Sequence, residues 1–239
     1  MQLKIFKDST ELSKAAAEWI VSLIQKKLAT GDRFCLLLSG GNTPKQLYQL
    51  LASDQYRNRI DWKGVHIFFG DERVVPFKDE RNNGKMAFDS LLSKVPIPKE
   101  QVHYIDTSQQ PEVAADNYAR LLHEYFDGED TTFDLALLGM GDDGHTLSMF
   151  PGTEAVNEKV KWVISIYLQS QQMDRITLTP VVVNKSAAIA FLVTGAAKAQ
   201  VLKRILEETS NAPAYPVQLI HPLSGELHWF VDEGAIVAI

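Results

Sequence analysis

Apolar residues recur at helical spacing between Leu12 and Leu28, with polar and charged residues at most of the intervening positions. Intervals of three and four residues place these side chains on one face, which predicts a helix packed against the protein core. Ser9 or Thr10 is the candidate N-cap, and Gly31 follows the expected end of the helix.

Short apolar runs that end in glycine or polar residues follow this helix and alternate with segments of helical pattern. The expected strands are 34–39, 65–70, 133–139, 162–167 and 187–194. The expected helices are 43–52, 83–92, 111–126 and 196–207. Strands that are apolar on both faces and alternate with helices predict an α/β fold with a mostly parallel, Rossmann-like sheet covered on both sides. Such sheets carry their binding sites at the carboxyl ends of the strands.

The composition fits one globular unit. The chain has 239 residues, of which 45% are apolar, so it can bury a large core. No internal repeat, low-complexity tract or long linker divides it, and we expect a single domain over 1–239. The oligomeric state stays open between a monomer and a small homo-oligomer.

Charge and cysteine content narrow the expected partners. The chain has 24 basic and 30 acidic side chains, a net charge of −6, and no Lys/Arg-rich run, so neither nucleic acid nor an anionic membrane is expected as the main partner. No segment approaches the roughly 18 apolar residues of a membrane span, and no secretory signal pattern is present, so a cytoplasmic location is expected. The single cysteine, Cys35, lies in an apolar run and is expected to be a core residue.

A glycine-containing turn follows the first expected strand and opens the next helix. This segment, 38–45, contains Gly40, Gly41 and the hydroxyls of Ser39 and Thr43. Glycines let a ligand approach the backbone, and unpaired N–H groups at a helix N-terminus attract phosphate. An ordinary strand-to-helix turn is the alternative, but the added hydroxyls favour an anion site.

Charged residues crowd at the end of the second expected strand, where Asp71, Glu72 and Arg73 follow Gly70. Loops at strand ends often carry functional residues, although a solvated loop explains the same pattern. Asn83, at the start of the next expected helix, either caps that helix or faces a ligand.

Three glycines, Gly139, Gly141 and Gly144, follow a further expected strand in the spacing G-x-G-x-x-G. A dinucleotide site would require a crossover helix after the third glycine and an acidic residue at the end of the next strand. Pro151 and Gly152 interrupt the helical pattern soon afterwards. The sequence therefore disfavours a nicotinamide dehydrogenase.

His145 lies in this glycine loop, beside Asp142 and Asp143. An unperturbed imidazole titrates near ~6.5 and can accept a proton at neutral pH, and a neighbouring carboxylate can orient it. A structural role is the alternative, but the flanking glycines and acids favour catalysis. The other five histidines lack metal-ligand spacing, so no metal site is expected.

Two further basic residues belong to short patterned segments. Arg175 begins the alternating stretch 175–179, and Lys198 lies in the first turn of the expected helix 196–207. A cation at a helix N-terminus opposes the helix dipole unless an anion joins it. Lys198 is therefore a mild indication of phosphate binding, and a solvated surface lysine fits equally well.

Taken together, these segments resemble the 6-phosphogluconolactonase family, in a superfamily that also includes glucosamine-6-phosphate isomerase/deaminase. The matching segments, in the family's order, are 39–44, 70–73, 141–146, 175–179, 193–198 and 229–233. The resemblance implies a three-layer α/β/α sandwich and hydrolysis of 6-phospho-D-glucono-1,5-lactone without a cofactor. The expected partner is that small phosphosugar lactone.

The resemblance also implies roles for individual residues. The catalytic group is His145, assisted by Asp143 or Asp142, and Arg73 stabilises substrate or developing charge. The implied phosphate-binding residues are Ser39, Gly40, Gly41, Asn42, Thr43, Arg175 and Lys198. From their positions after a strand and at a helix start, Asp71 and Asn83 are added as expected substrate-binding residues.

Two alternatives remain beside the lactonase. Deaminases of the superfamily usually carry Asp-Glu-Tyr where this chain has Arg73 in third place. They also carry an Asn-Glu pair shortly after the histidine, where this chain reads Ser148-Met149-Phe150-Pro151-Gly152. The missing glutamate removes a group that ring opening would use, whereas Asp71 does not discriminate. The second alternative is a sugar-phosphate-sensing module of a regulator. It is disfavoured because only about 33 residues precede the first expected strand, too few for a DNA-binding segment.

Overall fold

The computed structural model describes residues 1–207 and 214–236. Within these residues the centre of the molecule is a seven-stranded sheet in the order β1-β10-β9-β6-β2-β3-β5, and every neighbouring pair is parallel. The strands are β1 (Gln2–Phe6), β2 (Phe34–Leu38), β3 (Val65–Phe69), β5 (Val102–His103), β6 (Leu135–Leu138), β9 (Ala188–Val193) and β10 (Glu226–Asp232). The predicted parallel sheet is confirmed.

A second, three-stranded antiparallel sheet in the order β4-β8-β7 lies beside the first. Its strands are β4 (Asp71–Arg73), β7 (Val163–Leu168) and β8 (Met173–Leu178). The expected strand 162–167 exists, but its place in the parallel sheet was wrong. A turn at Gln169–Gln171, followed by Gln172 with φ +46°, folds it back onto β8 as a hairpin.

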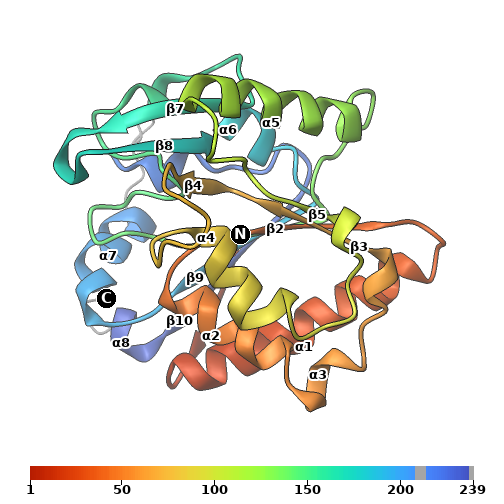
Figure 1. Ribbon diagram of the computed structural model, residues 1–239. Coiled ribbons are helices and arrows are strands. Elements are labelled where there is room, and N and C mark those ends of the chain that lie inside the picture. The colour runs from red at the N-terminus through yellow and green to blue at the C-terminus, as the bar shows by residue number, and fades with distance from the viewer. Residues whose placement is uncertain (208–213, 237–239) are drawn as a thin grey trace.

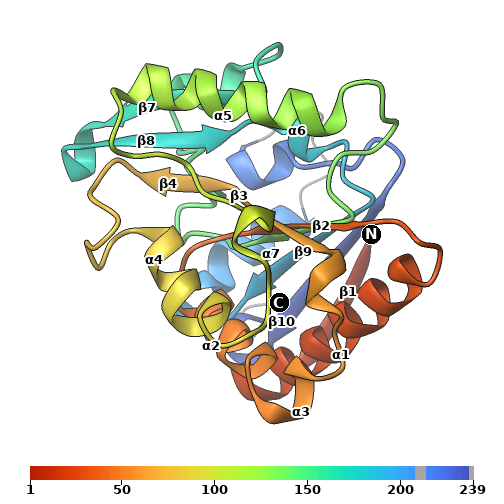
Figure 2. The same cartoon turned by 45° about the vertical axis from the view of Figure 1, so that its right-hand side comes forward.

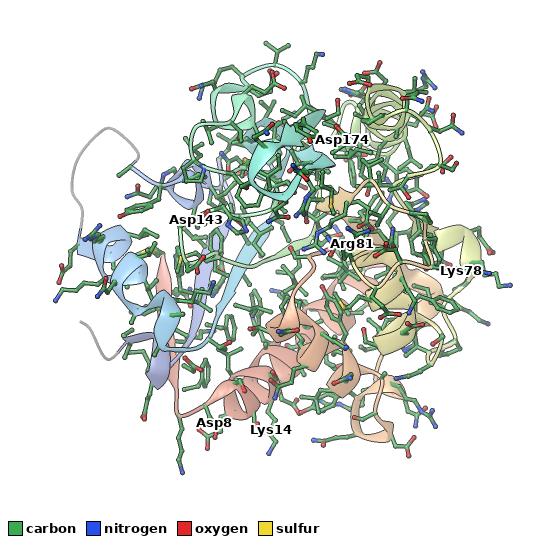
Figure 3. All side chains as sticks on the ribbon, turned by 60° about the vertical axis from the view of Figure 1, so that its left-hand side comes forward. Asp8, Lys14, Lys78, Arg81, Asp143 and Asp174 are labelled. Atoms are coloured by element: carbon green, nitrogen blue, oxygen red, sulfur yellow. The ribbon has the colours of Figure 1, made fainter. Side chains whose placement is uncertain are left out.

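Helices form in the five segments where the apolar spacing predicted them and in three short segments where it did not. They are α1 (Ser9–Leu28), α2 (Asn42–Leu51), α3 (Asp54–Arg57), α4 (Asn83–Ala87), α5 (Pro111–Phe126), α6 (Pro180–Val183), α7 (Ala199–Glu207) and α8 (Glu233–Ile236). The predicted cap of α1 was wrong, because Asp8, at the start of that helix in Figure 3, accepts from the amides of Thr10 and Glu11. A carboxylate at that position satisfies two helix-end donors.

Three layers result from this order. Figures 1 and 2 show α1, α2 and α4 on one face of the large sheet, with α5 and the three-stranded sheet on the other. The central strands are buried along their whole length, as parallel strands between two covering layers must be, and Cys35 lies in this core as expected.

The first strand of the sheet is β1, not the strand at 34–38. The expectation that about 33 residues precede the first strand was therefore wrong, because a five-residue edge strand with two polar residues carries a weak sequence signal. Among the described helices, none is both long and apolar enough to cross a membrane.

Candidate active site

A cavity of about 450 Å³ lies at the carboxyl ends of four neighbouring strands, β9, β6, β2 and β3. Strand ends in open parallel sheets meet along one edge, so segments far apart in sequence gather there. Eleven of the predicted site residues line the cavity: Ser39, Gly40, Gly41, Asn42, Thr43, Asp71, Arg73, Asn83, His145, Arg175 and Lys198. Asp143 stands behind His145, which it contacts.

The glycine turn lies between β2 and α2 and is held by its neighbours. The Ser39 hydroxyl donates to the Leu137 carbonyl of β6 at 2.5 Å, and the Tyr48 hydroxyl bonds both the amide and the carbonyl of Ser39. Gly41, with φ +110°, precedes the first turn of α2. The Ser39 proton is therefore engaged, and the turn can offer an anion its backbone N–H groups and the Thr43 hydroxyl.

His145 and Asp143 form a close pair at the cavity wall. The His145 Nδ1 atom lies 2.5 Å from Asp143 Oδ1, and the same oxygen accepts from the His145 amide at 3.0 Å. Partial burial acts to raise the pKa of Asp143, but these bonds outweigh it and hold the pKa below its ordinary value. Asp143 is thus the orienting carboxylate, and the exposed Asp142 does not line the cavity.

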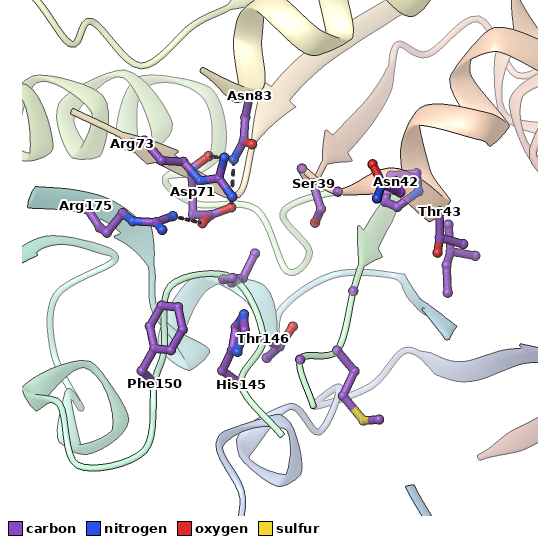
Figure 4. Close-up of a pocket in the computed structure, with 18 of the residues that line it drawn as sticks. Ser39, Asn42, Thr43, Asp71, Arg73, Asn83, His145, Thr146, Phe150 and Arg175 are labelled. Atoms are coloured by element: carbon purple, nitrogen blue, oxygen red, sulfur yellow. Dashed lines mark hydrogen bonds and ion pairs between the residues drawn. The ribbon is translucent and has the colours of Figure 1, made fainter. Parts of the chain in front are cut away.

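The pair fixes the tautomer of the ring. With an Asp143 carboxylate on Nδ1, the imidazole carries its proton there and keeps the Nε2 lone pair free to accept one. The ring of Phe150 stacks on His145, with centroids 4.1 Å apart, and holds its orientation (Figure 4).

Gly141 leaves the space that the imidazole occupies. A Cβ atom at this position would lie 2.1 Å from His145 Nδ1 and 2.6 Å from Asp143 Oδ1. We expect Gly141→Ala to displace the His145 ring and to reduce any activity that uses this ring by at least about tenfold, because small displacements of a reacting group are costly. In steady-state kinetics, Gly139→Ala supplies a control at another glycine of the cavity wall, since a Cβ there meets no protein atom within 4 Å and leaves the His145 ring in place. Equal effects of the two substitutions would contradict this account of the loop.

Asp71 and Arg175 lie on the opposite side of the cavity from the glycine turn (Figure 4). The buried Asp71 carboxylate accepts from the Ser148 hydroxyl at 2.6 Å and lies 4.0 Å from the Arg175 guanidinium. Asn83 donates to the Asp71 carbonyl at 3.0 Å, while Asn82 caps α4. Asn83 therefore does not cap the helix, and it lines the cavity.

Arg73 and Arg175 are directly opposite each other in the pairing of β4 with β8, and both line the cavity. Like charges at such positions repel and are destabilising. Burial lowers the pKa of Arg175 from its ordinary value, and the proximity of Arg73 lowers it further, against the opposing effect of Asp71. The Nε atoms of both arginines are buried without a hydrogen-bond partner among the described residues. The arrangement is suited to an anion or a developing negative charge.

Glu72, which the sequence placed in a solvated or functional loop, is buried. Its two oxygens accept from the amides of Arg73, Asn83 and Gly84 at 2.7 to 2.8 Å and so join β4 to the start of α4. Burial raises the pKa of Glu72 to about 7, although the three amides act to lower it. Glu72 thus holds the backbone of Arg73 and Asn83 in place through hydrogen bonds to their amides.

This burial makes stability depend on pH. The folded protein keeps the Glu72 proton up to about pH 7, whereas the unfolded chain releases it near its ordinary value, so stability is lost as pH rises through that window. Relative to Glu72→Gln, the wild-type unfolding free energy should fall by up to about 3 kcal/mol between pH 4.5 and 8. Denaturant titrations at both pH values measure it, with the exposed Glu124→Gln as control. A pH-independent difference would contradict the raised pKa.

Several lining residues were not singled out as site residues from the sequence. They are Thr146, Phe150, Gln171 and Thr194. Thr194 directly follows β9, and its hydroxyl lies 2.7 Å from that of Thr43. The buried Thr146 hydroxyl has no partner among the described residues. Thr146 and Thr194 could have been found from their positions next to His145 and at a strand end, whereas Gln171 comes from a hairpin turn with no such signal.

The chain matches the family described as glucosamine-6-phosphate isomerases/6-phosphogluconolactonase over residues 7–229 and belongs to it. It is 40% identical to "Probable 6-phosphogluconolactonase 3, chloroplastic" of Oryza sativa subsp. indica, covering 98% of this chain and 75% of that protein. It is 37% identical to the 6-phosphogluconolactonase of Rattus norvegicus, covering 98% and 91% of the two chains.

Solved structures agree on the fold. The 6-phosphogluconolactonase of Thermotoga maritima superposes with a TM-score of 0.84 at 30% identity, covering 97% of this chain and 99% of that one. A monomeric glucosamine-6-phosphate deaminase also superposes with a TM-score of 0.84, covering both chains fully, but at 20% identity it shows the fold alone. Among the described residues, no group of three His, Cys, Asp or Glu side chains could hold a metal ion.

Proposed function

We propose that this protein hydrolyses 6-phospho-D-glucono-1,5-lactone to 6-phospho-D-gluconate in the oxidative pentose phosphate pathway, without a cofactor. Family membership and the lactonases named above support this activity. The observation that carries the mechanism is the His145–Asp143 pair, which faces the same cavity as Arg73 and Arg175.

His145 is the proposed general base. Its Nε2 atom takes a proton from water as the water oxygen attacks the lactone carbonyl carbon, and Asp143 stabilises the imidazolium that forms. The bond between that carbon and the ring oxygen then breaks, and the imidazolium returns its proton to the leaving alkoxide. The product is the open-chain acid, and His145 is regenerated.

Arg73 and Arg175 are proposed to face the lactone end of the substrate. Figure 4 shows both beside Asp71, across the cavity from Ser39, Asn42 and Thr43. The Ser39 amide is bonded to Tyr48, so we assign the phosphate to the N–H groups of residues 40–43 and to Lys198. Arg175 thereby loses the phosphate role that the resemblance gave it. Arg73 stabilises the charge that develops on the carbonyl oxygen.

The deaminase alternative fits the local geometry less well. Ser148 occupies the region where deaminases carry their Asn-Glu pair, is fully buried, and donates its hydroxyl to Asp71. Both oxygens of the Asp71 carboxylate are already engaged, one by the Ser148 hydroxyl and one by the Asn83 amide, and the Arg175 guanidinium lies 4.0 Å away. Asp71 is thus suited to holding Arg175 in place.

A single domain over 1–239 is supported by the family match, which spans nearly the whole chain, although 208–213 and 237–239 lie outside the described residues. The cytoplasmic location stays a prediction, and the name of the rice relative places that protein in the chloroplast.

The test is turnover of freshly generated 6-phosphogluconolactone, followed as acid release with the spontaneous rate subtracted. We expect hydrolysis well above that background without added metal or nucleotide. Stoichiometric binding of 6-phosphogluconate with no acceleration of hydrolysis would instead indicate a sugar-phosphate-binding module and overturn the proposal.

A further inference from the structure

The segment 229–233 near the carboxyl end of the chain has no role in the mechanism above, and none of its residues lines the cavity. It forms the end of β10, which pairs with β9 so that Val231 lies beside Val193. Asp232, the next residue, therefore reaches the point where β9 ends and the turn bearing Lys198 begins.

Asp232 bonds this turn directly. Its Oδ1 atom accepts from the Gly195 amide at 2.9 Å, and the side chain is nearly buried, with the residue 8% exposed. The Gly195 carbonyl in turn accepts from the Lys198 amide at 3.1 Å. Two hydrogen bonds thus connect a carboxylate outside the cavity to the backbone of the proposed phosphate-binding lysine.

The turn depends on a support of this kind. Gly195 has φ +92°, and the 3₁₀ turn Ala196–Lys198 continues directly into α7 (Ala199–Glu207) without a side-chain cap at its start. The first amides of a helix have no partner within the helix, so the position of this turn depends on bonds from outside it. The same Oδ1 atom accepts from the Ala235 amide at 2.9 Å, which ties α8 to the turn.

We propose that Asp232 is a positioning residue that fixes the turn Ala196–Lys198 so that the Lys198 ammonium meets the substrate phosphate. This inference rests on the proposed function. If Asp232 only caps α8, its replacement lowers the stability of the fold, and its effect on KM is the same whether or not Lys198 is present.

A double-mutant cycle separates the two roles. Steady-state kinetics with 6-phosphogluconolactone are measured for wild type, Asp232→Ala, Lys198→Ala and the double variant, with thermal unfolding as a check on folding. We expect Asp232→Ala to raise KM by about tenfold with little change in kcat, because misplaced binding groups lose affinity. In the Lys198→Ala background the same substitution should have no further effect on KM. Asp232→Asn, which keeps an acceptor oxygen, should restore KM to within about twofold of wild type.

The outcomes are distinct. A wild-type protein without lactonase activity overturns the proposed function, whereas an active one in which the KM effects of Asp232→Ala and Lys198→Ala are independent overturns only this inference. An unchanged KM in Lys198→Ala would also overturn it. If Asp232→Ala does not fold, Asp232→Glu replaces it. The longer Glu side chain displaces the carboxylate. Asp232→Glu should therefore raise KM in the wild-type background and should not raise it further in the Lys198→Ala background.

Discussion

Replacing His145 with alanine is expected to reduce kcat for 6-phosphogluconolactone by ~10²- to 10⁴-fold, the range typical of a lost general base. KM should change little, because Lys198 and the glycine turn still bind the phosphate. The measurement is a fast assay of acid release, corrected for spontaneous hydrolysis.

His123 offers a matched control, because its Nδ1 atom also pairs with a carboxylate, that of Asp127 at 2.7 Å, but outside the cavity. His123→Ala should leave kcat within about twofold of wild type. A His145→Ala variant that retained full kcat would remove the proposed base from the mechanism.

Replacing Arg73 with alanine carries the second largest expected effect, a loss of ~10²- to 10³-fold in kcat, as for other donors that stabilise developing charge. The substitution also relieves the repulsion with Arg175 opposite it, so the folded protein should not be much less stable. Lowered kcat without lowered stability is the signature that distinguishes catalysis from a structural role.

Arg81→Ala is the control for this substitution. Arg81 is an exposed neighbour whose guanidinium pairs with Asp79, and only its backbone carbonyl accepts from Arg73. If Arg73→Ala instead raised KM at constant kcat, Arg73 would bind substrate and transition state equally, and the oxyanion role would belong to other donors.

The fold was predictable where strands are apolar on both faces. The runs that became β2, β3, β6 and β9 have no polar face, so their sequences indicate buried parallel strands directly. The three-stranded sheet was not predictable, because one of its strands has no apolar pattern. β4 consists of three charged residues, and pairing with β8 rather than local propensity makes it a strand.

The site was predictable where glycines and charged residues follow a strand. The glycine loop was expected to present His145, and the structure shows that Gly141 leaves the space for the His145 ring. The choice between Asp142 and Asp143 depended on the turn of the loop, which sequence spacing does not reveal. The burial of Glu72 and its bonds to α4 are long-range features with no local signal.

The net charge of −6 describes the whole molecule, whereas Arg73, Arg175 and Lys198 line the cavity together with the Asp71 carboxylate. A local cluster of this kind binds a small anion even when the whole protein carries negative charge, because salt screens exposed charges beyond about 8 Å at physiological ionic strength.

One measurement tests the central claim most directly: the kcat/KM of a single preparation for fresh 6-phosphogluconolactone and for glucosamine 6-phosphate, measured under the same conditions. The account predicts rapid lactone hydrolysis and no detectable release of ammonia. Ammonia release from glucosamine 6-phosphate, with lactone hydrolysis no faster than the spontaneous rate, would contradict it.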